Sequence, residues 1–454
     1  MITTRRAGSA RHWLAPLAGA FLAFSVAAPS LGAPSQTTAY IVVLEPNAPA
    51  AAIAAAQTRA HGTTPDFVYS HALRGYAARF SARAAEAISR SPSVAFVVPD
   101  DPIELYSSCA TVAPSATAQC LPEGVDRIDS DVSSTVAGDG TGANAINVAV
   151  IDSGIDFHHP DLDVVGGKLC AAGKRQGFDD NAGHGTHVAG IIGARDNGFG
   201  VVGIAPGARL WALRAGGDHG ASISNVICAV DFVTGTRTDG DPTNDIAVVN
   251  MSLGAKGSDD GDCGRTKKDA LHLAICASVA AGVTYVVSAG NDGVDLATQR
   301  PAAYDEVLTV TAITDYDGQP SGLGSPTCFN FGPDDTPTAF SNFAMPQDAG
   351  HTIAAPGACI MSTWPGRQGE APPELATYVY NSGTSMASPH VAGTVALCIA
   401  SGPCAGLTPA QVVQKIVADA GAHTGANPDY GFAGDPLHPV SGKYYGYLVW
   451  AGGY

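Results

Sequence analysis

The sequence predicts a three-layer α/β domain with a mainly parallel central sheet, preceded by a small α+β unit. The main observation for the large domain is a series of nearly continuous apolar runs, separated by helical stretches and Gly-rich turns. Strands of this composition are buried on both faces, which is typical of a parallel sheet covered by helices. We therefore expect functional residues at the carboxyl ends of the strands. The runs are 146–151, 210–213, 246–251, 283–287 and 307–313.

The small α+β unit is predicted from strand and helix patterns between residues 40 and 98. Two helical stretches, at 50–60 and 82–89, alternate with short runs rich in β-branched and aromatic residues. This order indicates four strands and two helices, in a ferredoxin-like arrangement. The strand patterns are 40–44, 67–70, 75–80 and 94–98.

The N-terminus has the layout of a secretory signal peptide. Arginines at positions 5, 6 and 11 precede an apolar stretch at about 14–28, and small residues follow up to Ala33. A membrane anchor is the alternative, but the stretch is short for a span of about 20 residues, and prolines flank it. We expect cleavage near Ala33 and a secreted protein, delivered outside the cell or into a periplasm.

Ten cysteines, an even number, fit an oxidising compartment. None of them shows the Cys-x-x-Cys spacing that is typical of zinc sites. The sequence does not determine how they pair. Short separation alone favours three disulfides, which are Cys109–Cys120, Cys263–Cys276 and Cys398–Cys404.

The formal net charge of −17 is distributed unevenly along the chain. Residues 1–105 carry +2, so the remaining 349 residues carry −19. A strongly acidic domain argues against nucleic acid and anionic membranes as partners. Solubility outside the cell is the simpler interpretation of this charge.

Ser385 lies in the most informative segment of the chain. A turn of small residues, which includes Gly383 and Thr384, carries its hydroxyl to the start of a predicted helix. Backbone N–H groups point outward there and favour developing negative charge, which suits a nucleophile. Taken alone, the serine would equally fit an ordinary helix cap.

Two further segments supply the partners that a nucleophilic serine needs. Asp152 follows the apolar run 146–151, and His184 opens the segment HGTHVAG. Alone, the Asp-Ser-Gly sequence would be a common turn after a strand. Together with Ser385, the order Asp, His, Ser is one of the chain orders known for serine-hydrolase triads.

These three segments resemble those of the subtilisin-like serine peptidases, the subtilase family, over about residues 118–400. The resemblance implies a subtilisin-like fold and a serine endopeptidase. Ser385 would then attack the peptide carbonyl, His184 would act as the general base, and Asp152 would orient the imidazole. By the same pattern His187, three residues after His184, is structural.

The resemblance also implies an oxyanion site at Asn291. The segment SAGNDG follows the run 283–287, and Asn291 matches the asparagine that donates to the tetrahedral oxyanion together with the Ser385 backbone N–H. An ordinary Asn-Asp-Gly turn is the alternative. The position directly after a buried strand favours the catalytic role.

Substrate binding is expected along two backbone edges. Ser252, Leu253 and Gly254 resemble the segment that pairs with the substrate backbone and lines the first specificity pocket. Gly216, with the glycine that follows it, would supply the opposite edge. The two edges would bind an extended peptide as an added strand. Binding of this kind depends on the peptide backbone more than on its side chains, which indicates broad cleavage of proteins and peptides.

A structural calcium site is implied by three oxygen-bearing side chains. Gln119, Asp161 and Asn197, with carbonyls of the loop 195–201, match the high-affinity calcium site of the family. Oxygen ligands of this kind suit Ca²⁺. Composition alone would make Asp161 a cap after the preceding proline.

The resemblance extends to the small N-terminal unit, which is similar to the inhibitory prodomain of subtilases. We therefore expect a signal peptide at 1–33, a prodomain at 34–106 and a peptidase domain at 107–454. The prodomain would act as an intramolecular inhibitor that the enzyme removes by its own cleavage, leaving a monomer. A small domain retained in the mature protein is the alternative for 34–106.

Two rival functions follow from the same residues. The first is a secreted binding protein that keeps the fold and binds peptides without turnover. The second is a peptidase dedicated to the maturation of one partner. Because all four catalytic positions are intact, the sequence favours a general serine endopeptidase.

Overall fold

The computed structural model describes residues 37–105, 108–110, 119–171, 177–180, 182–217, 220–320, 322–326, 328–366 and 377–454. The chain divides into two units, Met1–Gln36 and Thr37–Tyr454. The expected signal peptide and cleavage site near Ala33 lie outside the described residues, which all belong to the second unit. No helix in this described part is long and apolar enough to cross a membrane.

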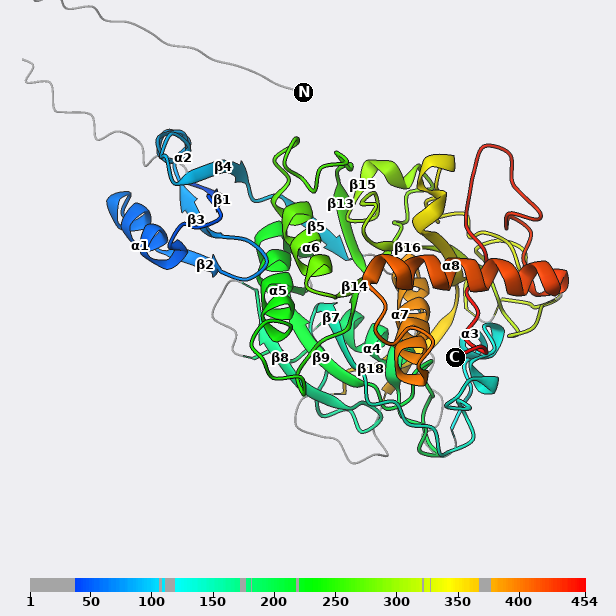
Figure 1. The fold of residues 1–454 in the computed structure, drawn as a ribbon. Coiled ribbons are helices and arrows are strands. Elements are labelled where there is room, and N and C mark those ends of the chain that lie inside the picture. Colours follow the sequence, from blue (N-terminus) through cyan, green and yellow to red (C-terminus); the bar gives the residue numbers. More distant parts are fainter. Residues whose placement is uncertain are drawn as a thin grey trace, which may run out of the picture. The chain divides into compact units, whose positions relative to one another are not determined.

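The N-terminal α+β unit has the predicted four strands and two helices (Figure 1). Its antiparallel sheet has the order β2-β3-β1-β4, with Val42 of β1 opposite Tyr76 of β3. The helices pack on this sheet around a small core that includes Val42, Phe80 and Ile88. The elements are β1 (Thr38–Leu44), α1 (Ala50–Ala60), β2 (Pro65–Tyr69), β3 (Gly75–Phe80), α2 (Ala82–Ser89) and β4 (Val94–Pro99).

The large domain is built on a seven-stranded sheet in which every pair of neighbours is parallel. The order is β17-β16-β14-β12-β7-β9-β8. The predicted three-layer α/β fold is therefore confirmed. The strands are β7 (Asn147–Asp152), β8 (Val164–Leu169), β9 (Arg209–Arg214), β12 (Val248–Met251), β14 (Thr284–Ser288), β16 (Leu308–Ile313) and β17 (Thr352–Pro356).

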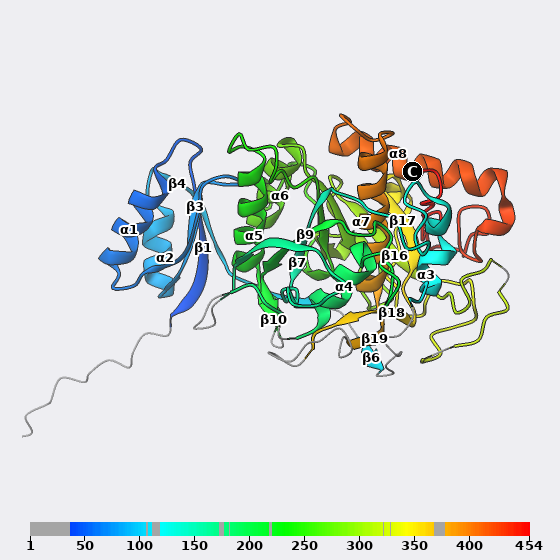
Figure 2. The ribbon, with the colours of Figure 1, turned by 90° about the horizontal axis from the view of Figure 1, so that it is seen from below.

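Helices cover both faces of this sheet (Figure 2). In β7, Val148 and Val150 join the core that includes α4 and α7, whereas Ala149 and Ile151 join the core that includes α5 and α6. Successive strand residues point to opposite faces, so a strand with a core on each side must be apolar throughout. The helices are α3 (Glu123–Arg127), α4 (His184–Gly193), α5 (Ile223–Thr236), α6 (Ala270–Ala280), α7 (Thr384–Ser401) and α8 (Pro409–Ala426).

Two smaller sheets are formed by short strands. One has the order β10-β11-β5-β13-β15 and the other the order β18-β19-β6. The strands are β5 (Pro102–Leu105), β6 (Ser108–Ala110), β10 (Gly216–Gly217), β11 (Gly220–Ser222), β13 (Leu253–Lys256), β15 (Gln299–Arg300), β18 (Ile360–Trp364) and β19 (Thr377–Ser382). Short 3₁₀ helices occur at η1 (Ser130–Val132), η2 (Leu296–Thr298), η3 (Pro346–His351) and η5 (Pro428–Tyr430).

The disulfides correct one of the three predicted pairs. Cys263–Cys276 and Cys398–Cys404 form as predicted, but Cys120 is a free thiol, so the pair Cys109–Cys120 is wrong. The physical reason is the backbone pairing. Cys109 lies opposite Asn381 of β19, whereas the backbone of Cys120 forms an isolated β-bridge with Val201. Two longer-range disulfides, which sequence separation did not favour, are Cys170–Cys228 and Cys328–Cys359.

Candidate active site

The three predicted triad residues lie where secondary-structure elements begin or end. Asp152 is the last residue of β7, His184 is the first residue of α4, and Ser385 is the second residue of α7. All three side chains are buried, with at most 4% of the residue exposed. Asp152 therefore lies at the carboxyl edge of the sheet, where the sequence predicted functional residues.

Asp152 and His184 form a direct pair. His184 Nδ1 lies 2.9 Å from both carboxylate oxygens of Asp152. A carboxylate only accepts, so Nδ1 carries the hydrogen and Nε2 carries the lone pair of the neutral ring. This is the tautomer that a general base for a hydroxyl requires.

The turn before His184 is held by glycine and by a carboxylate that the sequence analysis missed. Gly183 has φ 94°, and a Cβ there would lie 2.2 Å from the Trp364 ring. Asp180 accepts hydrogen bonds from Gly183 N at 2.9 Å and from the Thr186 N–H and hydroxyl at 2.9 and 2.6 Å. Asp180 thus caps α4 from outside the helix, in place of the glycine at the N-cap. Its position four residues before His184 was the only available signal.

Ser385 is tied to the strand-end segment around Ser252. The Ser385 hydroxyl donates to the Ser252 carbonyl at 3.2 Å, and the Ser252 hydroxyl donates to the Ser385 carbonyl at 2.7 Å. Asn250 donates to the Ser252 hydroxyl at 2.9 Å and accepts from Ser388 at 2.7 Å. This buried network fixes the first turn of α7 against the end of β12.

Asn291 is also fixed to the turn before Ser385. Its Oδ1 accepts from the Thr384 N–H at 2.9 Å and from the Thr384 hydroxyl at 2.8 Å. Since the amide oxygen is engaged, the Nδ2 hydrogens are the donors that Asn291 can offer to another group. The predicted oxyanion residue is therefore hydrogen-bonded to the residue directly before the predicted nucleophile.

A strand that follows the N-terminal unit lies between two strands of the large domain (Figure 1). Strand β5 pairs antiparallel with β13, where Leu105 is opposite Leu253 and Glu104 is opposite Gly254. On its other side β5 pairs with β11, where Ile103 is opposite Ala221. Leu253 directly follows Ser252, whose carbonyl accepts the Ser385 hydroxyl. The extended strand is thus held beside the nucleophile by backbone pairing on both edges.

The structure differs from the expectation at Gly216. Gly216 lies in β10, which pairs with β11, so it is one strand away from β5. The edge that contacts β5 on this side is β11, Gly220–Ser222. Strand β11 follows β10 in the chain and pairs with it, so β11 is the strand that reaches β5.

Side chains reinforce the contact between the N-terminal unit and α5. Asp231 of α5 accepts from the backbone N–H groups of Ser70, His71 and Ala72 at 2.5–3.2 Å. In return, Asp100 accepts from the Ser224 N–H at 2.8 Å and from its hydroxyl at 2.7 Å, in the first turn of α5. Each carboxylate satisfies donors that would otherwise lose their water on contact.

Comparison with known proteins matches both parts of the chain. Residues 143–433 match the model of the subtilase family, and residues 39–106 match that of the peptidase inhibitor I9 family. Subtilisin E of Bacillus subtilis (strain 168) is 32% identical over 331 residues, which cover 72% of this chain and 71% of that protein.

The chain belongs to the subtilase family. Two further relatives of this subtilase are a subtilisin of Bacillus pumilus, 33% identical over 290 residues (63% of this chain, 87% of that protein), and subtilisin Savinase of Lederbergia lenta, 32% identical over 281 residues (62% and 84%). The predicted family is confirmed, and the chain is a serine endopeptidase with an N-terminal I9-type propeptide domain.

The subtilase keeps a second histidine, His187, buried one turn after His184. Its Nε2 lies 3.0 Å from the carbonyls of Ile360 and Val379, which can only accept. Burial lowers the pKa of His187 to about 3, so the ring is neutral at physiological pH. His187 therefore joins α4 to β18 and β19 without carrying a charge into the site.

The three predicted calcium ligands of the subtilase lie together. Asp161 Oδ1 accepts from Asn197 Nδ2 at 3.0 Å, and its Oδ2 accepts from Val201 N at 3.1 Å. Gln119 Oε1 accepts from Gly198 N, and Gln119 Nε2 donates to the Arg195 carbonyl, both at 3.0 Å. The loop 195–201 thus wraps around one buried carboxylate and two amide side chains.

This donor set fits a hard cation. Asp161 is fully buried, and burial raises the pKa of its carboxyl to about 7, which marks a carboxylate that lacks a full counter-charge. A Cβ at Gly200 would lie 1.9 Å from the Tyr378 hydroxyl and 2.5 Å from Asp161 Oδ2, so glycine leaves room for the hydroxyl that donates to this oxygen at 3.2 Å. Carboxylate, amide and carbonyl oxygens are the ligands that Ca²⁺ prefers.

Proposed function

We propose that this subtilase is an exported, self-processing endopeptidase that uses Asp152, His184 and Ser385 as its catalytic triad. The observation that carries the proposal is the buried Asp152–His184 pair, whose tautomer leaves Nε2 as the base, on the same sheet edge as a serine at a helix start. The residues come from three distant segments, and each is held by its own local network.

The proposed reaction begins when Ser385 Oγ attacks the carbonyl carbon of the substrate. His184 Nε2 takes the hydroxyl proton, and Asp152 stabilises the resulting imidazolium. Asn291 Nδ2 and the Ser385 N–H donate to the oxyanion. When the C–N bond breaks, His184 returns the proton to the leaving amine, and water then hydrolyses the acyl-enzyme by the same sequence of steps.

Substrates are proposed to bind as β5 does. Leu253 and Gly254 would pair with the peptide on one side, Ser252 would hold the residue next to the scissile bond, and β11 would pair on the other side. Recognition through backbone hydrogen bonds supports cleavage of many proteins and peptides.

The N-terminal unit is proposed as the inhibitory prodomain, residues 34–106, with the peptidase domain at 107–454. Strand β5 supports this role, because it lies between β11 and β13 and ends at Leu105 beside the predicted boundary. Residues 106 and 107, where the cut is predicted, lie outside the described residues. The charge pattern of residues 1–33 supports export in the form of a signal peptide.

Calcium is proposed to bind at Gln119, Asp161 and Asn197, with carbonyls of the loop 195–201. The ion would neutralise the buried carboxylate and hold the loop, and it takes no part in the chemical step. We predict that exhaustive chelation lowers the Tm and releases bound calcium. Unchanged metal content and an unchanged Tm after chelation would contradict the site.

Fluorophosphonate labelling with intact-mass analysis tests the proposed function. The wild type should be mature in size and carry one adduct on Ser385, whereas Ser385→Ala should accumulate as an unlabelled precursor. A matched control is Ser401→Ala, at the far end of the same helix, which should process and label as the wild type does. A folded, processed wild type without adduct would overturn the proposal.

A further inference from the structure

Three side chains outside the catalytic site converge at the opposite edge of the large sheet. Asp305 lies just before β16, and Asp348 and His351 lie in η3, just before β17. One ligand atom from each lies within 4.8 Å of the others. Because β16 and β17 are parallel neighbours, this cluster is at their amino ends, whereas Asp152 lies at a carboxyl end.

The ring of His351 has a defined orientation. Its Nδ1 lies 3.2 Å from the Val307 carbonyl, which can only accept, so Nδ1 carries a hydrogen. Its Nε2 is buried and has no hydrogen-bond partner. Nε2 lies 3.8 Å from Asp305 Oδ1 and 4.0 Å from Asp348 Oδ1, which is too far for hydrogen bonds.

Asp348 presents a second orphaned atom. Asp348 is only 7% exposed, and its Oδ2 is buried without a hydrogen-bond partner. Among the described residues, neither Asp305 nor Asp348 forms an ion pair with lysine or arginine. The charged neighbours that act on them are other carboxylates, Asp259, Asp295 and Glu306, besides histidine. Burial raises the pKa of both carboxyls.

We propose that Asp305, Asp348 and His351 bind a divalent transition-metal ion, for which Zn²⁺ is the best fit. Two carboxylates and one imidazole are typical zinc ligands, and an ion about 2.0–2.2 Å from each would occupy the gap that now separates Nε2 from the two oxygens. The Nδ1–H bond to a backbone carbonyl is the outer contact that metal-binding histidines usually make. Imidazole favours zinc over calcium.

The side chain of Asp305 gives the ion a route from solvent. It is 69% exposed, whereas the side chains of His351 and Asp348 are 6% and 10% exposed. With three protein ligands, a water molecule would complete a tetrahedral site. Because the site lies away from the carboxyl edge, the ion would join the segments before β16 and β17 and would not act on the substrate.

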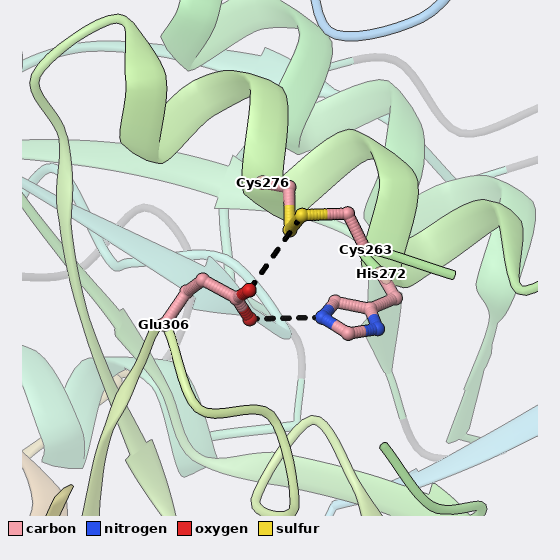
Figure 3. A group of neighbouring side chains, drawn as sticks. All are labelled: Cys263, His272, Cys276 and Glu306. Carbon is pink, nitrogen blue, oxygen red and sulfur yellow. Dashed lines mark hydrogen bonds and ion pairs between the residues drawn. A yellow bond between two sulfur atoms is a disulfide. The ribbon is translucent and has the colours of Figure 1, made fainter. Parts of the chain in front are cut away.

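A neighbouring cluster around His272 differs from that of His351 in how its histidine is paired (Figure 3). There, His272 Nε2 bonds directly to Glu306 at 2.8 Å, and Cys263 and Cys276 form a disulfide that leaves no thiolate. The carboxylate of Asp260 near His272 Nδ1 already accepts from the N–H groups of Gly264 and Lys267. His272 Nδ1 has no hydrogen-bond partner and lies 3.6 Å from Asp260 Oδ1 and 3.8 Å from Asp259 Oδ1. The ring is nevertheless already paired with Glu306 through Nε2, whereas His351 makes no direct hydrogen bond to a carboxylate.

Zinc titration of the full chain tests the proposal. The Ser385→Ala background prevents autolysis, and saturating calcium occupies hard-cation sites. We expect one Zn²⁺ per chain above background by metal analysis, a Tm that rises with added Zn²⁺, and absorption bands of a bound ion when Co²⁺ replaces zinc. His351→Gln should weaken Zn²⁺ binding by at least about 10-fold. Changing a residue that only contacts a metal ligand already costs about 10-fold or more, and His351 is proposed as a ligand itself.

Two further variants separate metal binding from folding. Asp305→Asn changes an exposed side chain, so it should fold normally and still lose affinity. His438→Gln is the matched control, because His438 also follows an aspartate by three residues but bonds directly to Asp435 at 3.1 Å. Equal Zn²⁺ affinity in all variants, or no Zn²⁺ bound by the parent, would overturn the proposal and leave an ion pair of His351 with the two carboxylates.

Discussion

At the scale of single residues, catalysis is expected to depend on the hydrogen that His184 carries on Nδ1. Asp152→Asn keeps the size of the side chain but can donate to the ring, which favours the other tautomer. We predict a loss of about 10⁴ in kcat, the size known for this change in other serine peptidases. Peptide hydrolysis by the purified variant measures it, with the exposed Asp139→Asn as a control. A loss below about tenfold would show that Asp152 does not orient the base.

The oxyanion role of Asn291 makes a separate prediction. Asn291→Ala removes the Nδ2 donors and should lower kcat by about 10²–10³ with little change in KM, because the bond forms only in the transition state. Thr384→Val removes one of the two hydrogen bonds that hold the Asn291 oxygen. Its backbone N–H remains, so kcat should fall by less than in Asn291→Ala. Equal losses in the two variants, or a change confined to KM, would contradict this assignment.

At this scale the sequence carries a signal where a residue has one plausible partner type. Asp152, His184 and Ser385 stood out because an acid, an imidazole and a hydroxyl followed recognisable strand and helix signals. Asp180 was missed because its carboxylate accepts from backbone groups, which leave no trace in the sequence. The wrong pair Cys109–Cys120 has the same cause: sequence separation says nothing of which strands the two cysteines join.

At the scale of elements, strand patterns predicted the buried strands well, because a strand covered on both faces must be apolar throughout. The short edge strands were harder. Gly216 and its neighbour suggested an edge for the substrate, but backbone pairing places β11 between β10 and β5. A glycine pair specifies a flexible backbone and not the partner of a strand, so the register could not be predicted from residue type.

The contact between α5 and the N-terminal unit gives a prediction about elements. Asp231→Ala leaves the N–H groups of Ser70, His71 and Ala72 without their acceptor. The N–H of Ala72 is the buried donor among them, and leaving it unsatisfied should cost about 1–3 kcal/mol. In the Ser385→Ala precursor, residues 65–80 should exchange amide hydrogens faster and be cleaved sooner by added protease. The exposed Asp241→Ala is the control. Unchanged exchange in 65–80 would show that this carboxylate does not hold the unit.

At the scale of the whole molecule, the sequence predicted the layers but not the order of the strands. The apolar runs required a sheet buried on both faces, and the resemblance supplied the subtilisin-like topology. The sheet order, with β7 between β12 and β9, is what brings Asp152 and the end of β12 to one edge. The same order brings Asp305 and His351 together at the other edge, since β16 and β17 are neighbours. Contacts between neighbouring strands depend on topology, which the sequence does not give. Sequence motifs pointed to the residues at the first edge, but no motif marked the residues at the second.

The pH dependence of folding can be tested through one deeply buried histidine. Burial lowers the pKa of His390 from 6.5 to about 4, so between these values only the unfolded chain binds the proton. His390 therefore costs stability as the pH falls through this window, by about 1.4 kcal/mol per pH unit. His390→Gln cannot take up this proton. Urea unfolding of the Ser385→Ala precursor at pH 7, 6 and 5, with and without His390→Gln, isolates this group from the other titrating residues. The variant should gain stability relative to its parent as the pH falls, and a constant difference would contradict the assignment.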